Sequence, residues 1–268
     1  MVYVTGDVHG GFDMDKLREL DGRGSLPAVL PEGAAGSPAR DGRDAPRLAK
    51  VPVPGAGDYL IVCGDFGFPW DFSDEECADI GWLESRPYTV LFVDGNHECF
   101  GHWAERPMES WHGGLVQRLA DGSPIRRLAR GEVFLLDGAC IFTMGGATSV
   151  DRAWRTPYFD WWPQELPDEE NFEQARAKLD EQGWDVDYVI THTCANSMLP
   201  HALYPDRGWH APGQDRLTTF FEELEARLSY RHWYFGHFHR DRAIDARHTV
   251  LYQAVVPLGA TVVEERGA

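Results

Sequence analysis

The chain has 268 residues, of which 43% are hydrophobic and 25% are charged, as in an ordinary soluble globular protein. Its formal net charge of −18 argues against a broad nucleic-acid surface, because such a surface needs a basic face. The longest apolar runs have the length of strands, and Met1 directly precedes a strand-like run, so we expect neither a membrane span nor a signal peptide. The five cysteines form no CxxC pair, which favours a reduced, cytoplasmic setting.

The first predicted strand, Val2–Thr5, runs directly into the sequence Gly-Asp-Val-His-Gly. Asp7 and His9 are two positions apart, so an extended backbone directs both side chains to the same side. A carboxylate with an imidazole is a common ligand pair for a first-row divalent metal. We expect a short helix to follow, from Phe12 to about Leu20.

Residues 22–57 differ in composition from the rest of the chain. Prolines alternate there with Gly, Ala, Ser and Arg. Such a segment buries too little apolar surface to offset the entropy that ordering removes. We therefore expect a solvated insertion between two strands, with a flap near the predicted site as the alternative.

Two further apolar runs end in polar side chains. Residues 59–63 lead into Asp65, and residues 89–93 lead into the Asp-Gly-Asn-His sequence that contains Asn96 and His97. In an open α/β sheet, ligands bind at this carboxyl edge of the strands. Together with the first strand, these runs indicate a parallel sheet.

Three helices are indicated by caps and apolar spacing. The first spans 73–83, with Ser73 as its cap and Glu76 as the capping-box partner. The second begins after Asp168 and ends at Gly183. The third carries apolar residues at helical spacing over 217–228.

The middle of the chain has a different pattern. Short apolar runs between 125 and 143 are separated by turns, and Asp137-Gly138 is a strong hairpin signal, so we expect a second, antiparallel region. Gly145 then opens a loop rich in aromatic and arginine side chains: Arg152, Trp154, Arg155, Tyr158, Trp161 and Trp162. Such a loop lines either a binding site or a small core of its own, and the sequence leaves both interpretations open.

Histidines follow the last two long strands. His192 follows the strand 187–191, and the strand 232–235 leads into a Gly-His-Phe-His sequence. The tail, from Thr249 to Val263, predicts two more strands.

The strand-end residues together make up a metal-ligand set: Asp7, His9, Asp65, Asn96, His192, His237 and His239. These side chains suffice for two metal ions with one bridging carboxylate. No cysteine belongs to the set, so a cysteine-rich structural zinc site is not expected.

The ordered motifs GDVHG, GDFG, GNHE, TH and GHFH resemble those of the calcineurin-like metallophosphoesterases. The resemblance extends from Asp7 to His239, and the stretch that begins RGEVFLLDG is similar to a bacterial and phage branch of that superfamily. It implies an α/β fold, a four-layer αββα double β-sandwich. We expect a single domain over 1–268 with an insertion at about 22–57.

The resemblance also implies a role for each site residue. Asp7, His9 and His239 would hold one ion, Asn96, His192 and His237 the other, with Asp65 bridging and His97 donating a proton. We expect two divalent ions, manganese or iron favoured, zinc or nickel possible.

The expected reaction is hydrolysis of a phosphate ester. A metal-bridging hydroxide would attack phosphorus while His97, as imidazolium, protonates the leaving oxygen. Phosphoprotein phosphatases of this superfamily carry an Asp-Arg-Gly sequence that grips phosphate, whereas Phe68 stands where the Asp that orients their catalytic histidine would be, so a phosphodiester is favoured. Candidate substrate contacts are Arg130, Arg152, Arg155, Arg207 and His210, and Asp71 is a candidate partner for His97.

Other functions remain possible from the sequence. A nucleotide or dinucleoside-polyphosphate hydrolase is the main alternative, and the acidic balance disfavours a nuclease. A non-catalytic scaffold is disfavoured because the ligand set is complete. The expected partner is a small phosphoester substrate, with no membrane partner, and the sequence does not define the oligomeric state.

Overall fold

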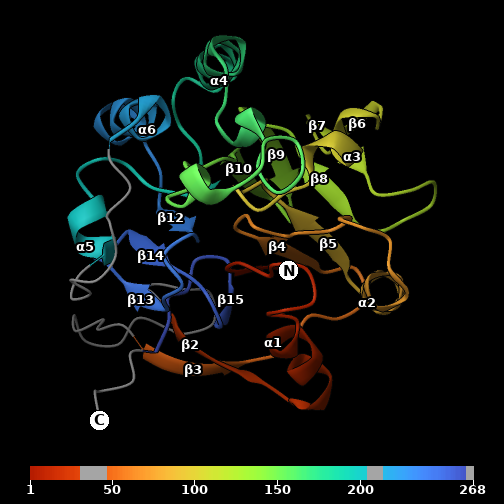
Figure 1. The fold of residues 1–268 in the computed structure, drawn as a ribbon. Coiled ribbons are helices and arrows are strands. Elements are labelled where there is room, and N and C mark those ends of the chain that lie inside the picture. The colour runs from red at the N-terminus through yellow and green to blue at the C-terminus, as the bar shows by residue number, and fades with distance from the viewer. Residues whose placement is uncertain (31–46, 204–213, 264–268) are drawn as a thin grey trace.

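The computed structural model describes residues 1–30, 47–203 and 214–263, in which two large β-sheets pack against each other (Figure 1). The seven-stranded sheet has the order β15-β1-β4-β5-β8-β7-β6, and the six-stranded sheet has the order β13-β14-β12-β11-β10-β9. The first sheet comprises β1 (Val2–Thr5), β4 (Tyr59–Val62), β5 (Thr89–Phe92), β6 (Met108–Trp111), β7 (Gly114–Arg118), β8 (Arg126–Leu128) and β15 (Val255–Pro257). The second comprises β9 (Glu132–Leu136), β10 (Ala139–Met144), β11 (Tyr188–Thr191), β12 (His232–Phe235), β13 (Arg242–Ala243) and β14 (His248–Val250).

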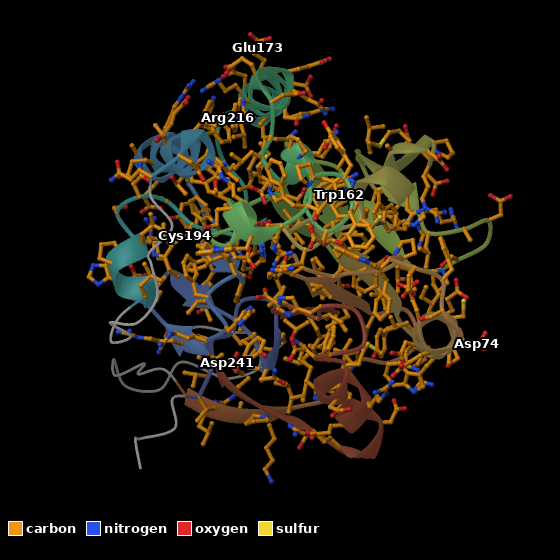
Figure 2. The ribbon with its side chains drawn as sticks, in the orientation of Figure 1. Asp74, Trp162, Glu173, Cys194, Arg216 and Asp241 are labelled. Carbon is orange, nitrogen blue, oxygen red and sulfur yellow. The ribbon has the colours of Figure 1, made fainter. Side chains whose placement is uncertain are left out.

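Helices cover the outer faces of the sheets. The α-helices are α1 (Asp15–Arg18), α2 (Asp74–Glu84), α3 (Phe100–Ala104), α4 (Glu169–Glu181), α5 (Leu199–Leu203) and α6 (Arg216–Arg227). Short 3-10 helices are η1 (Glu19–Gly22), η2 (Arg152–Trp154) and η3 (Pro163–Glu165). In Figure 1, α4 and α6 lie on one side of the sheets, and α1 and α2 lie on the other. In Figure 2, Glu173 of α4 and Arg216 of α6 lie on that first side.

Two apolar clusters explain this layering. Ile61 of β4 and Ile190 of β11 belong to one cluster, which therefore fills the space between the sheets. On its other face, the second sheet packs Trp233 against Phe172 of α4 and Leu224 of α6. Burying large side chains in this way is the main favourable term in folding. The expected αββα double β-sandwich is confirmed.

The strand directions place the carboxyl ends of the central strands together. β1, β4 and β5 run parallel, as predicted. β10, β11, β12 and β14 are parallel as well. Of the runs between 125 and 143 expected to be antiparallel, β8 pairs antiparallel with β7 and β9 with β10, while β8 is parallel to β5 and β10 is parallel to β11. The β9–β10 hairpin turns at Asp137 and Gly138, whose φ angles of 49° and 79° match the turn type that Asp-Gly favours.

Two local predictions need correction. Ser73 caps α2 by accepting from the backbone N–H of Glu76, but the Glu76 carboxylate accepts from Trp70, Asp71 and Phe72 instead of completing a capping box. That carboxylate therefore fixes the loop before α2. The helix expected from Phe12 is shorter, beginning at Asp15 and continuing as η1.

The insertion at 22–57 is more structured than expected, where the structure describes it. β2 (Leu26–Leu30) and β3 (Arg47–Val51) form an antiparallel pair. Leu26, Ala28 and Val51 are buried in the main core, so apolar side chains hold this hairpin on the molecule. Within the described residues, no helix combines the length and the apolar character that crossing a membrane requires.

A cluster of ionisable side chains fastens α6 to β14. His248 Nδ1 lies 2.8 Å from Asp245 Oδ1, and its Nε2 lies 2.7 Å from the Tyr230 hydroxyl and 3.2 Å from Glu225 Oε2. Burial lowers the pKa of His248, but its bonds to Glu225 and Asp245 outweigh burial and raise the pKa above its ordinary value. The charged imidazole therefore stabilises the fold fully below about pH 6.5, and this contribution is lost as the pH rises through the raised, folded-state pKa.

His248→Gln tests this cluster, because glutamine can form hydrogen bonds but does not titrate. We expect the variant to lower the free energy of unfolding by roughly 1.5–3 kcal/mol at about pH 5.5, and by clearly less at about pH 9. Urea unfolding of the metal-free proteins at both pH values measures the difference. A loss that stayed constant or grew with pH would contradict the assignment.

Candidate metal centre

The seven predicted ligands come together at the carboxyl ends of strands from both sheets. Asp7, Asp65 and Asn96 follow β1, β4 and β5, while His192 and His237 follow β11 and β12. Three groups have ligand atoms within 4.8 Å of one another: Asp7–His9–His239, Asp65–His192–His237, and His9–Asp65–His97. The third group contains His97, which the sequence assigns to proton donation and not to metal binding. The first group is the ligand set predicted for one ion, and the second joins Asp65 to two of the three ligands predicted for the other.

Asp65 lies between these two groups. Its Oδ2 atom is 3.2 Å from His9 Nε2, and its Oδ1 atom is 3.3 Å from His192 Nε2. Asn96 Oδ1 also lies 3.2 Å from His192 Nε2, which places the amide on the second side. One carboxylate facing both groups is the arrangement that a bridging ligand needs.

Backbone N–H groups hold the two central carboxylates. The His237 N–H lies 2.9 Å from Asp7 Oδ1, and the His97 N–H lies 2.7 Å from Asp65 Oδ1. Burial opposes ionisation of Asp65, but His192 and His97 hold its pKa well below the usual range. The pKa of Asp7 is also lowered, because the bond from His239 and the charge of His192 offset its burial. Both carboxylates are therefore ionised.

The donor set fits divalent ions. The two carboxylates are buried, 0% exposed for Asp7 and 1% for Asp65, so their charges need positive partners. Although burial lowers the pKa of His9 and His192, the carboxylates raise it to about 9 in each case. His9 and His192 therefore carry protons on ring nitrogens that would face a bound cation. Oxygen and imidazole donors around such negative potential suit first-row divalent metals.

Several ligands have a backbone that L-residues seldom adopt. His9, Asp65, His237 and His239 have φ angles of 48°, 49°, 70° and 50°. Such conformations persist only where the surroundings enforce them, and they cluster at functional sites. The strain therefore supports a functional origin for these loops.

The glycines of the motifs leave room for the ligands. A Cβ added at Gly95 would lie 2.1 Å from Asp65 Oδ1, and one at Gly236 would lie 2.2 Å from Asp7 Oδ1. Each glycine thus lets the backbone of one motif pack directly against a carboxylate of another. The Gly-Asn and Gly-His pairs in the sequence reflect this close approach.

Arg155 is the partner that the structure gives to His97. Its Nη2 and Nη1 atoms lie 3.3 and 3.4 Å from the two ring nitrogens of His97. Asp151 Oδ1, at 2.7 Å from Arg155 Nε, and the Asp160 carbonyl, at 3.0 Å from Nη1, hold the guanidinium in place. Asp71, the partner considered from the sequence, instead accepts from the Ser73 N–H at the start of α2.

The structure gives no contact between His97 and the other candidate substrate contacts that it describes. Arg130 is buried, with its guanidinium bonded to the Asp94 carboxylate and the Gln164 carbonyl, so it serves as an internal ion pair. Arg152 is exposed. Arg207 and His210 lie outside the described residues.

The sequence left two interpretations of the long loop open, a small core and the lining of a binding site, and both find support. Trp162, labelled in Figure 2, belongs to a small buried cluster with Cys99 and Phe100, which forms a core. In the same loop, Arg155 contacts His97.

Two buried or semi-buried acids at the site are not predicted by the motifs. Glu98 accepts from the N–H groups of Phe66, Gly67 and Gly95, and so ties two ligand loops together. Burial raises its pKa to about 8. Asp13 lies behind His9, at 2.7 Å. Its spacing of four residues from His9 is the signal that could have indicated it.

A double β-sandwich with Asp, Asn and His side chains gathered at its strand ends is an arrangement that could hold metal ions. Residues 1–241 match the calcineurin-like phosphoesterase family, and the chain belongs to that family. It is therefore a metallophosphoesterase, an enzyme that hydrolyses phosphoester bonds. A search of curated proteins found no match to the chain.

Gly95→Ala tests the close approach between the motifs. The added methyl group meets the Asp65 carboxylate and its backbone nitrogen, so we expect metal affinity to fall by roughly 10–100-fold. Gly81→Ala is the matched control, since nothing lies within 4 Å of a Cβ there. Titration with Mn²⁺ measures both variants. Unchanged affinity in Gly95→Ala would show that the site tolerates displacement of Asp65.

Proposed function

We propose that the chain is a dinuclear metal-dependent phosphodiesterase. The observation that carries this proposal is the position of Asp65, with one carboxylate oxygen toward His9 and the other toward His192. Asp7, His9 and His239 would hold one ion, and Asn96, His192 and His237 the other. When bound, the ions would neutralise phosphate oxygens and lower the pKa of a water to make it a nucleophile.

His97 is the proposed general acid. Its backbone N–H is engaged by Asp65, which fixes the imidazole next to the ligands. Burial lowers the pKa of His97, Arg155 lowers it further, and Asp65 only partly compensates. A lowered pKa makes the imidazolium a stronger acid, and the proposed role requires His97 to be protonated when the leaving alkoxide departs.

Arg155 is the proposed phosphate contact. Of the three arginines considered within the described residues, it is the one that touches a site residue, whereas Arg130 is engaged by Asp94. Because Asp151 and the Asp160 carbonyl hold its guanidinium, Arg155 is preorganised for an anionic oxygen. A single arginine, without an Asp-Arg-Gly sequence, suits the single charge of a diester better than a dianionic monoester.

Exposed aromatic side chains favour a second candidate, a nucleotide or dinucleoside-polyphosphate hydrolase. Trp154, Tyr158 and Phe159 are 83%, 68% and 73% exposed, in the loop that carries Arg155. Aromatic faces of this kind can stack on a nucleobase. Faster turnover of a dinucleoside polyphosphate than of simple diesters would favour this alternative.

The proposal also covers which metal ions bind, the cellular compartment and the branch of the family. Manganese or iron is favoured, with zinc or nickel possible. Protein sites bind several divalent metals, so the ion that is found depends on which metals are available as well as on their affinities. All five cysteines are free, which is compatible with a reduced, cytoplasmic setting. We place the chain in the bacterial and phage branch of the family on its RGEVFLLDG sequence alone.

Metal content tests the dinuclear site. We expect two ions per chain in the reconstituted wild type, close to none in Asp65→Ala, and mainly one in Asn96→Ala, because Asp65 faces both groups. Metal analysis after removal of free ions gives the counts. One ion or fewer per wild-type chain would refute the dinuclear proposal, and two ions in Asp65→Ala would refute the bridge.

His97→Ala tests the acid role. An alkyl leaving group needs a proton and an activated aryl group does not, so we expect an alkyl diester to slow by ~10²–10⁴-fold and bis-p-nitrophenyl phosphate far less. Metal content should stay unchanged. Steady-state rates on both substrates give the comparison, and equal losses would exclude general acid catalysis. Faster turnover of phosphopeptides than of any diester would exclude the diester preference.

A further inference from the structure

The imidazole of His9 has a carboxylate on its outer side. Its Nε2 atom lies 3.2 Å from Asp65 Oδ2, and its Nδ1 atom lies 2.7 Å from Asp13 Oδ2. An ionised carboxylate only accepts, so Nδ1 carries the hydrogen in this contact. Asp13 thereby determines which nitrogen of His9 is available to bind an ion, namely Nε2.

Tyr252 contacts both this carboxylate and another ligand. Its hydroxyl donates to Asp13 Oδ1 at 2.8 Å. Its ring stacks on the His239 imidazole, with centroids 4.8 Å apart and planes at 15°. One side chain therefore supports His9 through Asp13 and supports His239 directly.

Lys16 fixes the backbone around this pair. Its ammonium group is buried and donates to the carbonyls of Gly6, at 3.1 Å, and of Asp7 and Tyr252. The backbone N–H of Tyr252 is in turn held by Asp241, at 2.8 Å. All three ligands of one group, Asp7, His9 and His239, are thus tied to one set of supports.

The other group of ligands is supported differently. His192 Nδ1 lies 2.8 Å from the backbone carbonyl of Cys63, while the nearer oxygen of the Asp7 carboxylate is 3.8 Å away. A carboxylate behind an imidazole makes the ring a more basic ligand and fixes its orientation. His9 and His192 therefore differ in what holds the Nδ1 atom: a carboxylate at 2.7 Å for His9 and a backbone carbonyl at 2.8 Å for His192.

We propose that Asp13 and Tyr252 are positioning residues for the ion of the Asp7–His9–His239 group, an inference that rests on the proposed metal function. Neither residue belongs to the predicted ligand set. Tyr252 also lies beyond residues 1–241, the part of the chain that matches the family. Asp13 sets the orientation of His9, and Tyr252 holds Asp13 and the His239 ring together.

Titration of metal-free protein with Mn²⁺ against a chelator, without substrate, tests the pair. In Asp13→Ala, the affinity for one ion should fall by roughly 10–100-fold while the other ion binds as in wild type. Asp13→Asn should lose less, because its amide oxygen can still accept from His9. Tyr252→Phe loses the hydroxyl and keeps the stack, so its loss should be smaller than that of Tyr252→Leu.

Asp15→Ala is the matched control, because this substitution also removes one carboxylate from the same segment. The Asp15 side chain is 87% exposed and pairs with Arg18. This variant should bind both ions normally. Thermal unfolding of each metal-free variant shows whether the fold is intact, and Asp13→Asn carries the comparison if Asp13→Ala does not fold.

Wild-type affinity in Asp13→Ala, equal loss of both ions, or an equal effect of Asp15→Ala would each overturn the inference. A wild type that binds a single ion would refute the dinuclear proposal. The inference would then be tested by whether the Asp13 variants bind that ion more weakly than the wild type does. A wild type that binds no ion would overturn both.

Discussion

Asp7 and Asp65 lie fully buried beside each other, and the charge of each raises the free energy of ionising the other. Burying an unpaired carboxylate costs several kcal/mol, so a fold that keeps two of them ionised must surround them with positive or polar groups. The chain supplies these from both sheets: the N–H groups of His97 and His237, and the rings of five histidines, His9, His97, His192, His237 and His239. Strand ends of both sheets therefore contribute groups that offset the burial of this pair.

The remaining features of the centre follow from bringing so many groups close together. Motif glycines allow the loops to pack against the carboxylates, and Glu98 joins two of these loops through three backbone N–H groups. Four ligands have left-handed backbone conformations, which are unfavourable for histidine and aspartate unless the surroundings compensate. Hydrogen bonds between neighbouring loops provide that compensation.

The sequence predicts the central strands, the caps at Ser73 and Asp168, and the convergence of the seven ligands, because each depends on local pattern or on parallel strand order. It does not predict the β2–β3 hairpin, because the proline-rich composition of 22–57, with Pro27 inside β2, indicates a solvated insertion although both strands carry apolar residues. The sequence also offers Asp71 as a candidate partner of His97, whereas in the structure Arg155 contacts His97. Such contacts depend on how long loops fold back, and composition carries little information about that.

The ligands of one group are separated by almost the whole chain: His239 Nε2 lies 3.2 Å from Asp7 Oδ2. Closing so long a loop has an entropic cost that grows slowly with length, and contacts of this kind form late in folding. An ion that needs both ends of the chain binds the fully assembled sandwich and not its separate parts. By mass action, metal supply would then set how much of the chain persists in the assembled state.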